Sequence, residues 1–300
     1  PGECAVKFGG VVQGTRGGAA PRAAVGLELQ RRGHDVVVVV PPNLVSLIER
    51  AGLESVVAWG PSSENRVLSW DRQGVAGWSP ARGGGTAPAP RPKIPNPVSE
   101  IRHFQAYLAD GWAEMSETLS AVARDADLIL TGLTYQEVAA NVAERYGVKL
   151  AAIHYVPIRA NTISQPVGLP RFLVDRGYAL SEWVFWRLLK PADDAQRRTL
   201  GLPEVHTRSA RRVVEQGTLE IQAYDNVLFP GLDEQWAGRR PFVGALTMQL
   251  STTTDADVDA WIDAGTPPIY FGFGSTPVED PAKLVVELFL VAQRPDLRGG

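Results

Sequence analysis

The sequence predicts an α/β protein built on a doubly wound parallel sheet, followed by the beginning of a second domain of the same kind. Short apolar strands alternate with helices and glycine-rich turns over residues 5–59 and again over residues 127–155. Alternation of this kind specifies a sheet with helices on both faces. The five consecutive valines at 36–40 indicate a strand that is buried on both faces of a parallel sheet.

The first strand-helix-strand order is bounded by residues that start and stop helices. We expect a strand at 5–12, a helix at about 21–32, a strand at 36–40, a helix at 43–50 and a strand at 55–59. Pro21 suits a first helical turn, Gly33 suits the position after a helix, and Asn43 is expected to cap the second helix. Gly9 and Gly10 should weaken the first strand, by roughly 0.5 to 1 kcal/mol each relative to alanine.

The alternation of strands and helices resumes after a segment that carries few large apolar side chains. Residues 73–97 are rich in Gly, Ala, Pro and Arg, so they cannot offset their ordering entropy by burial, and a mobile surface loop is predicted there. We expect a helix at about 99–123, a strand at 127–131, a helix at 135–145 ended by Gly147, and a strand at 150–155.

The middle of the chain is less regular. An aromatic-rich helix contains Trp183, Phe185, Trp186, Leu188 and Leu189; it could pack in the core or line an apolar pocket, and core packing is favoured. A polar region at 193–217 is predicted to include a short helix ended by Gly201, and residues 227–229 a short strand.

Two domains follow from this pattern. Residues 1–244 form the first, and residues 245–300 hold a linker, running to about residue 257, and the start of the second. There we expect a helix at 259–264, a strand at 268–273, a turn at Gly274 to Pro277 and a helix at 281–291. Because the chain begins at Pro1 and stops at Gly300 just after this helix, a truncated fragment is predicted.

Composition narrows the class of partner. A net charge of −3 and a pI near 5.9 provide no basic field for nucleic acid or an anionic membrane, so a small-molecule partner is favoured. Cys4 is the single cysteine, which excludes an intrachain disulfide and a cysteine-rich metal site. No apolar stretch reaches the roughly 18 to 20 residues of a membrane span, and no signal peptide is evident. A cytoplasmic location is the expectation.

Polar residues can be sorted by the edge of the sheet at which they fall. Ligands of open parallel sheets bind beyond the carboxyl ends of the strands. That edge should carry residues 13–18, Asn43, 131–137 and 154–161, with 274–276 in the second domain. His34 falls at the opposite edge, where a structural role is favoured.

The glycine-rich turn after the first strand offers backbone N–H groups near a helix start and one cation, Arg16. Such turns also serve tight turning alone. The spacing differs from G-x-G-x-x-G and Pro41-Pro42-Asn43 follows the valines, which argues against a nicotinamide cofactor and an oxidoreductase. Signals of nucleotide hydrolysis, zinc proteases and serine hydrolysis are absent from the sequence.

Read together, several motifs resemble the GT-B glycosyltransferases, in particular the bacterial enzymes that act on glycopeptides, sterols and glycolipids. The motifs are Gly14-Thr15-Arg16-Gly17, the segments at 24–29 and 31–36, Pro41-Pro42-Asn43, Tyr135-Gln136-Glu137, Gly231-Leu232, the segment at 240–244 and the segment at 267–275. The resemblance implies two Rossmann-like domains, the first binding an acceptor and the second a nucleotide-diphosphate sugar. The sugar nucleotide is then a co-substrate, and no metal or other cofactor is implied.

The resemblance also implies a role for individual residues. The substrate-binding residues it implies are Gly14, Thr15, Arg16, Gly17, Gly18, Gln136 and Tyr155, and the donor-phosphate residues are Gly274 and Ser275. The implied activity is transfer of a hexose from a UDP- or dTDP-sugar to a hydroxyl of a lipid, sterol, glycopeptide or polyketide-like acceptor.

The family's usual catalytic base is missing. Its first-strand loop commonly reads Gly-Thr-Arg-Gly-Asp, and this chain has Gly18 in place of the aspartate. Glycine cannot accept the proton of an acceptor hydroxyl. The candidate replacements are His154, which could equally be a structural residue at the end of a strand, and Glu137, whose place in a first helical turn the helix dipole explains.

A second reading therefore stays open. The chain could be a non-catalytic module that binds a hydrophobic acceptor, either as a degenerate homologue or as a half that needs a separate donor-binding chain. The donor signature of the family, a His-His-Gly-Gly-Ala-Gly-Thr-like run, is absent from the sequence.

Overall fold

The computed structural model describes residues 7–11, 16–57, 111–133, 135–163, 170–248, 253–266, 268–272 and 280–292. The chain divides into two compact units, Pro1–Met248 and Gln249–Gly300. The predicted loop at 73–97 lies outside the described residues, as do Gly14, Thr15, Gly274 and Ser275.

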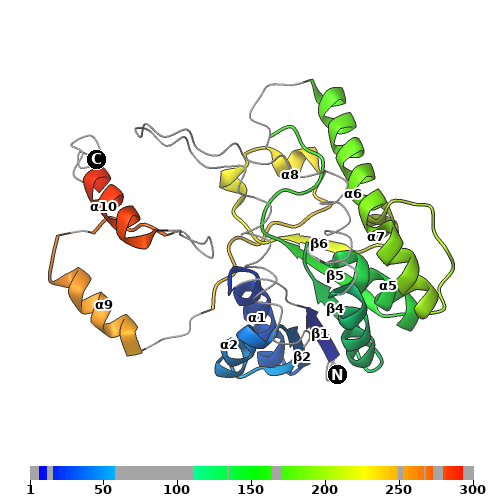
Figure 1. The fold of residues 1–300 in the computed structure, drawn as a ribbon, viewed down its shortest axis with the longest axis horizontal. Helices are drawn as coiled ribbons and strands as arrows, with labels where there is room; N and C mark the ends of the chain where they lie inside the picture. Colours follow the sequence, from blue (N-terminus) through cyan, green and yellow to red (C-terminus); the bar gives the residue numbers. More distant parts are fainter. Residues whose placement is uncertain are drawn as a thin grey trace, which may run out of the picture. The chain divides into compact units, whose positions relative to one another are not determined.

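The first unit is built on a six-stranded sheet, which confirms the predicted fold class (Figure 1). Its strands are β1 (Lys7–Val11), β2 (Asp35–Val40), β3 (Glu54–Val57), β4 (Leu128–Thr131), β5 (Lys149–His154) and β6 (Leu219–Gln222), in the order β3-β2-β1-β4-β5-β6. All the strand pairs are parallel, so the carboxyl ends share one edge. The order reverses between β1 and β4, which is the place where doubly wound sheets bind ligands.

Helices cover both faces of this sheet. The helical elements of the first unit are α1 (Arg16–Arg31), η1 (Pro42–Leu44), α2 (Val45–Arg50), residues 111–123, α5 (Gln136–Tyr146), α6 (Arg171–Thr199), α7 (Ser209–Glu215), η2 (Asn226–Leu228) and α8 (Leu232–Gln235). Ile129 of β4 packs with residues 111–123, α5 and α6, whereas Leu130 packs with Val25 of α1. Because consecutive strand residues point to opposite faces, these two clusters lie on opposite sides of the sheet.

The glycines of β1 have a packing reason. A Cβ atom on Gly9 would lie 3.0 Å from Cγ1 of Val122, so the helix at 111–123 approaches the strand where a side chain would obstruct it. Gly9 thus lets the helix pack closely against β1, which offsets part of the strand propensity that glycine lacks.

Two helix starts differ from the sequence prediction. α1 begins at Arg16 and carries Pro21 inside it, rather than beginning there. Pro21 has no N–H to donate to the carbonyl of Gly17, so one backbone hydrogen bond is lost, and the loss of helix stability is confined to the first turns. Asn43 does not cap α2: it lies within η1, and no side-chain hydrogen bond caps α2 at Leu44. The stop signals at Gly33 and Gly147 are confirmed by their positive φ angles of 88° and 68°.

The elements after residue 170 differ more from the sequence prediction. Residues 226–228 form the 3-10 turn η2 instead of a strand, and the edge strand is β6, in which Glu220 and Gln222 are buried. The predicted helix ending at Gly201 is the last part of the 29-residue α6. Core packing was wrong for Trp183 and Phe185, which are 48% and 50% exposed, while Leu189 is buried.

The second unit contains α9 (Thr253–Asp263) and α10 (Pro281–Ala292). α9 begins within the stretch that was expected to be a linker. Residues 268–272, expected to form a strand, have no strand pairing in the described part of this unit. A parallel strand needs a neighbour to satisfy its backbone, and the described residues of this unit supply none. Across the described ranges of both units, no helix combines the length and the apolar run needed to cross a bilayer.

Candidate functional site

The carboxyl edge of the sheet collects several of the predicted site residues. Arg16, Gly17 and Gly18 begin α1, next to the end of β1. Gln136 and Glu137 begin α5 after β4, while His154 ends β5 and Tyr155 follows it. Since these strands are parallel, all of these residues lie at the same edge of the sheet.

Gly18 and Tyr155 are in direct contact. The Tyr155 hydroxyl donates to the carbonyl oxygen of Gly18 at 3.1 Å, and Nη1 of Arg22 donates to the same oxygen at 2.9 Å. The Arg22 guanidinium also lies over the Tyr155 ring, 5.5 Å from its centroid. Two predicted binding residues are thus brought together by an arginine that the sequence analysis did not select.

Arg22 is a buried cation. It is only 6% exposed, and desolvation lowers its pKa below the usual value. A Cβ on Gly132 would lie 1.6 Å from Nη2 of Arg22, so only glycine leaves space for the guanidinium at the end of β4. Among the described residues Arg22 has no carboxylate partner, and its Nε has no hydrogen-bond acceptor. A positive charge is therefore held at the carboxyl edge without neutralisation by that part of the chain.

His154 is buried and neutral at neutral pH. The residue is 1% exposed, and neither ring nitrogen has a hydrogen-bond partner among the described residues. Burial lowers the pKa of His154 to about 4; Glu220 opposes this, while Arg159, Arg240 and Arg22 add to it. A neutral imidazole can accept a proton, although its low pKa makes it a weak base.

Glu137 contacts Ser209 of α7 rather than the residues around Gly18. The Ser209 hydroxyl of α7 donates to its Oε1 at 3.2 Å, and burial raises the pKa of Glu137, with nearby Asp193 adding to the increase. In the described part of the chain no hydrogen bond joins Glu137 to Gly18, His154 or Tyr155. The structure thus brings Tyr155 to Gly18, whereas neither His154 nor Glu137 forms a hydrogen bond with Gly18 among the described residues.

Unpartnered polar atoms concentrate at this edge. Half of the buried side-chain polar atoms that lack a partner in the described residues belong to four side chains here: Arg22, Thr131, Gln136 and His154. Buried polar groups are normally hydrogen-bonded, so such a concentration marks a place that a ligand or water completes. Each of the four can donate a hydrogen bond, which favours a ligand rich in oxygen acceptors.

A second group of charges lies beside the edge strand β6. Glu220, whose side chain is 4% exposed, accepts from Arg159 through Oε1 and from Nε of Arg240 through Oε2 at 2.8 Å. Although burial opposes ionisation, these two guanidiniums lower the pKa of Glu220. Glu220 was not selected from the sequence, whereas Arg159 fell within the edge segment 154–161 and Arg240 within the family motif 240–244. The one usable signal for Glu220 was a charged residue at an alternating position of the β6 segment.

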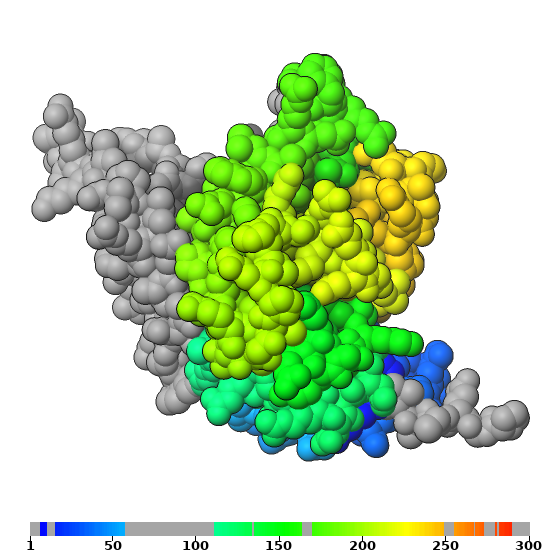
Figure 2. All heavy atoms as spheres, turned by 90° about the vertical axis from the view of Figure 1, so that its right-hand side faces the viewer, coloured from blue at the N-terminus to red at the C-terminus, as the bar shows by residue number. Residues whose placement is uncertain are grey.

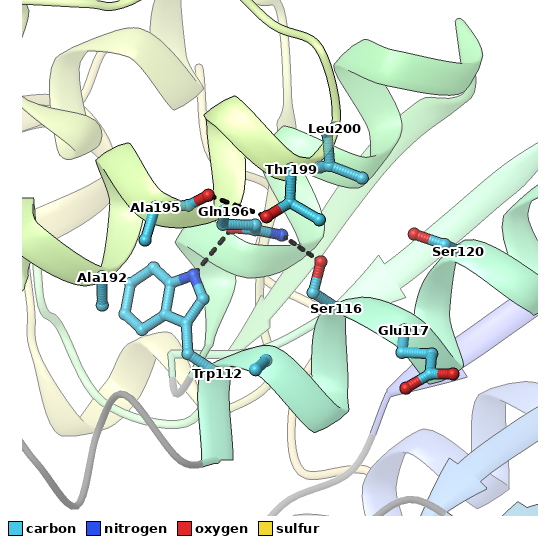
Figure 3. A pocket seen from close by; sticks show the side chains of 10 residues that line it. Trp112, Ser116, Glu117, Ser120, Ala192, Ala195, Gln196, Thr199 and Leu200 are labelled. Carbon is cyan, nitrogen blue, oxygen red and sulfur yellow. Dashed lines mark hydrogen bonds between the residues drawn. The ribbon is translucent and has the colours of Figure 1, made fainter.

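A further cavity, of about 390 Å³, lies between the helix at 111–123 and the last turns of α6 (Figure 3). Gln196 accepts from Trp112 Nε1 at 2.7 Å and donates to the Ser116 hydroxyl at 3.0 Å in its wall. None of the predicted site residues lines this cavity, so we assign it to helix packing. In the described residues, no group of three or more His, Cys, Asp or Glu side chains is arranged to hold a metal ion.

Comparison with known proteins gives the following relatives. No protein-family model matches the chain. An uncharacterized glycosyltransferase of Mycobacterium tuberculosis is 50% identical over 91% of this chain and 62% of its own length. An uncharacterized glycosyltransferase of Mycobacterium leprae is 44% identical over 93% of the chain and 63% of its own length. A sterol 3-beta-glucosyltransferase of Arabidopsis thaliana is 25% identical over 96% of the chain and 44% of its own length.

Among solved structures, the glycotransferase of kitacinnamycin has a TM-score of 0.49 at 16% identity, covering 84% of this chain and 54% of its own. An Arabidopsis thaliana glycosyltransferase complexed with UDP has a TM-score of 0.48 at 16% identity, covering 95% and 63%. The chain spans about three fifths of the length of the mycobacterial relatives.

Proposed function

We propose that this chain is part of a GT-B glycosyltransferase and that its first unit binds the acceptor in the transfer of a hexose from a UDP- or dTDP-sugar to an acceptor hydroxyl. The observation that carries the proposal is that Arg22, Thr131, Gln136 and His154, all at the carboxyl edge, have buried polar atoms without partners in the described residues, and that Arg22 contacts Gly18 and Tyr155. An acceptor rich in hydroxyl oxygens satisfies such donors. The acceptor classes we propose are lipid, sterol, glycopeptide and polyketide-like compounds.

We further propose that His154 accepts the proton of the acceptor hydroxyl. Tyr155 follows it in the chain and contacts Gly18, the position at which related enzymes commonly carry their base. Because its pKa is about 4, His154 holds its imidazole in the proton-accepting form at neutral pH but is a weak base, so we expect slow transfer by this chain. Gly274 and Ser275 are proposed to contact the donor phosphates.

The test joins the chain to the donor half of the Mycobacterium tuberculosis relative, because the chain spans only 62% of that protein. Radiolabelled UDP-glucose and dTDP-glucose are supplied with cholesterol, a monoacylglycerol, a glycopeptide aglycone and a polyketide aglycone. We expect labelled product with at least one acceptor, and a loss of roughly 10²-fold or more for His154→Gln. The matched control is His206→Gln, since His206 is exposed, and it should leave the rate unchanged.

The second candidate is a binding module without catalysis. It is favoured by the absence of a proton-accepting side chain at Gly18 and by the low pKa of His154. Saturable acceptor binding by the joined protein with no labelled product would support this candidate over the enzyme. A joined protein that is folded and neither binds nor glycosylates any of the four acceptors would refute both.

A further inference from the structure

A basic cavity lies beside the edge strand β6, between α6, α7 and α8. Its volume is about 370 Å³, within the range of small-molecule sites. Five arginines line it: Arg159, Arg171, Arg211, Arg239 and Arg240. Asp175 and Glu182 are the acidic residues of its lining. In Figure 2 the first half of α6 stands at the top of the molecule, with the residues of α8 beside it.

The carboxylates near the cavity leave a surplus of positive charge. Glu220 is shared by the buried guanidiniums of Arg159 and Arg240, so one negative charge faces two positive ones. Glu182 lies 3.9 Å from Arg208, which is outside the lining, and Asp175 lies 3.8 Å from Arg171. Arg211 pairs at 2.7 Å with Glu215, which is also outside the lining, so the surplus rests on Arg159, Arg239 and Arg240. Arg239 donates only to the carbonyl of Trp236 among the described residues. This surplus favours an anion inside the cavity.

The arrangement of these groups suits an oxyanion. Side chains of Arg159 and Arg240 are 11% and 12% exposed, and the Arg240 guanidinium is packed over the Trp236 ring at 5.1 Å from its centroid. Arginines fixed in this way present planar N–H pairs that match a carboxylate or a phosphate in a bidentate manner. A partly desolvated position strengthens such bonds.

α6 also carries an exposed apolar surface, and none of its five apolar side chains lines the cavity. The same half of the helix that supplies Arg171, Asp175 and Glu182 to the lining also carries exposed apolar side chains. They are Phe172, Leu173, Leu180, Trp183 and Val184, between 44% and 61% exposed. At 100° per residue these five fall within about one third of the helix circumference, together with Arg176 and Arg187 and without an acidic residue. An acyl chain fits such a face, and the positive charges of Arg176 and Arg187 on the face complement an anionic head group.

We propose that the arginine cavity binds an anionic amphiphile, with its carboxylate or phosphate among Arg159, Arg239 and Arg240 and its apolar chain on the exposed apolar side chains of the same half of α6. The proposal rests on the proposed function in taking this amphiphile as the acceptor. It narrows the acceptor classes to compounds that carry an acid group next to an apolar chain.

The test is a calorimetric titration of the full chain below the micelle concentration of each probe. Lysophosphatidate is compared with the monoacylglycerol of the same chain length, which lacks the phosphate, and 12-hydroxystearate with its methyl ester, so that every probe carries a hydroxyl. We expect the anionic member of at least one pair to bind at least 10-fold more tightly, and the pair that shows the preference identifies phosphate or carboxylate as the head group. Equal affinities within both pairs overturn the proposal.

Variants of the protein distinguish binding of the amphiphile's head group from binding of its apolar chain. Arg239→Gln with Arg240→Gln should abolish the preference for the anion, and Glu220 keeps Arg159 as its partner in this variant. Arg239→Gln alone serves where the double variant fails to fold, and it should reduce the preference at least 3-fold. Arg198→Gln, an exposed arginine of α6 outside the cavity, is the matched control. Trp183→Ser should weaken the lysophosphatidate and the monoacylglycerol equally.

These experiments can refute the inference of amphiphile binding and the proposal of sugar transfer separately. A preference for the anion that persists in the double arginine variant overturns the cavity as its site, whatever the joined protein does with sugar nucleotides. Amphiphile binding of the expected specificity without sugar transfer leaves the inference standing as a binding site and counts against the enzyme.

Discussion

Replacing Arg197 by alanine is expected to lower the free energy of unfolding by about 3–5 kcal/mol, because the change removes a buried guanidinium with several hydrogen bonds, two of them to the partly exposed carboxylate of Glu144. Arg197 is 1% exposed. Its Nη1 donates to Asn141 Oδ1 and to Glu144 Oε2, each at 2.8 Å, and its Nη2 donates to Glu144 Oε1 at 2.8 Å. Its Nε donates to the carbonyl of Pro203 at 2.8 Å.

The neighbouring groups make this loss large. Asn141 also donates to Asp193 at 2.6 Å and to Gln196 at 2.8 Å, and Asp193 pairs with Arg212 at 3.2 Å. These side chains join α5, α6 and α7, and Gln196 extends the network to Trp112 and Ser116 of the helix at 111–123 (Figure 3). Removing Arg197 therefore takes one donor from Asn141, which keeps Arg212, and takes from the Pro203 carbonyl the donor that it has among the described residues.

Urea denaturation followed by circular dichroism measures the effect. The next residue supplies the control: Arg198 is exposed, and Arg198→Ala should change the free energy by no more than about 0.5 kcal/mol. For a unit of this size the Arg197 variant should also melt roughly 6–20 °C lower. Equal losses in the two variants would show that the network does not stabilise the first unit.

The second large effect concerns Gly18→Asp, which should raise sugar transfer by the joined protein by roughly 10²- to 10⁴-fold, the usual contribution of general base catalysis. Gly18 lies in the first turn of α1, where no acidic residue is present. An aspartate there lies four residues before Arg22 and can form an ion pair with it on the same face of the helix. That pairing keeps the carboxylate ionised and able to accept a proton.

Stability should rise with activity in this variant. The new carboxylate neutralises the buried charge of Arg22 and meets the positive end of the helix dipole, together worth roughly 1–2 kcal/mol. Gly17→Asp is the control, because Gly17 is exposed and lies five residues before Arg22. It should gain only the dipole effect and no activity. A Gly18→Asp protein that is as slow as the original would mean that the missing base does not limit transfer.

The sheet could be predicted from the sequence because its signals are local. The five valines of β2 and the helix-ending glycines Gly33 and Gly147 do not depend on distant parts of the chain. β6 was missed because Glu220 and Gln222 break its apolar pattern, and both are buried only through partners far away in sequence, such as Arg159. A buried charge of this kind has no local signature.

The same reason limits prediction of the candidate site. Strand ends and the family resemblance placed Gly18, His154 and Tyr155 at one edge of the sheet. Arg22 escaped notice because an arginine in a helix is usually exposed, and its burial depends on the absent side chain of Gly132. The stretch at 193–217 was described from the sequence only as polar, yet Asp193, Gln196 and Arg197 are buried among complementary polar groups.

The central claim is that the acceptor binds at the carboxyl edge of the sheet, next to His154. The chain has four histidines, so imidazole nitrogen resonances can be assigned by replacing each with glutamine. We expect the ring of His154 to stay neutral until the pH approaches about 4, and its resonances to shift when the acceptor that receives sugar in the transfer assay is added. The resonances of His34, at the amino edge beside Phe8, should stay in place. Saturable acceptor binding that leaves the His154 resonances unmoved would contradict the account.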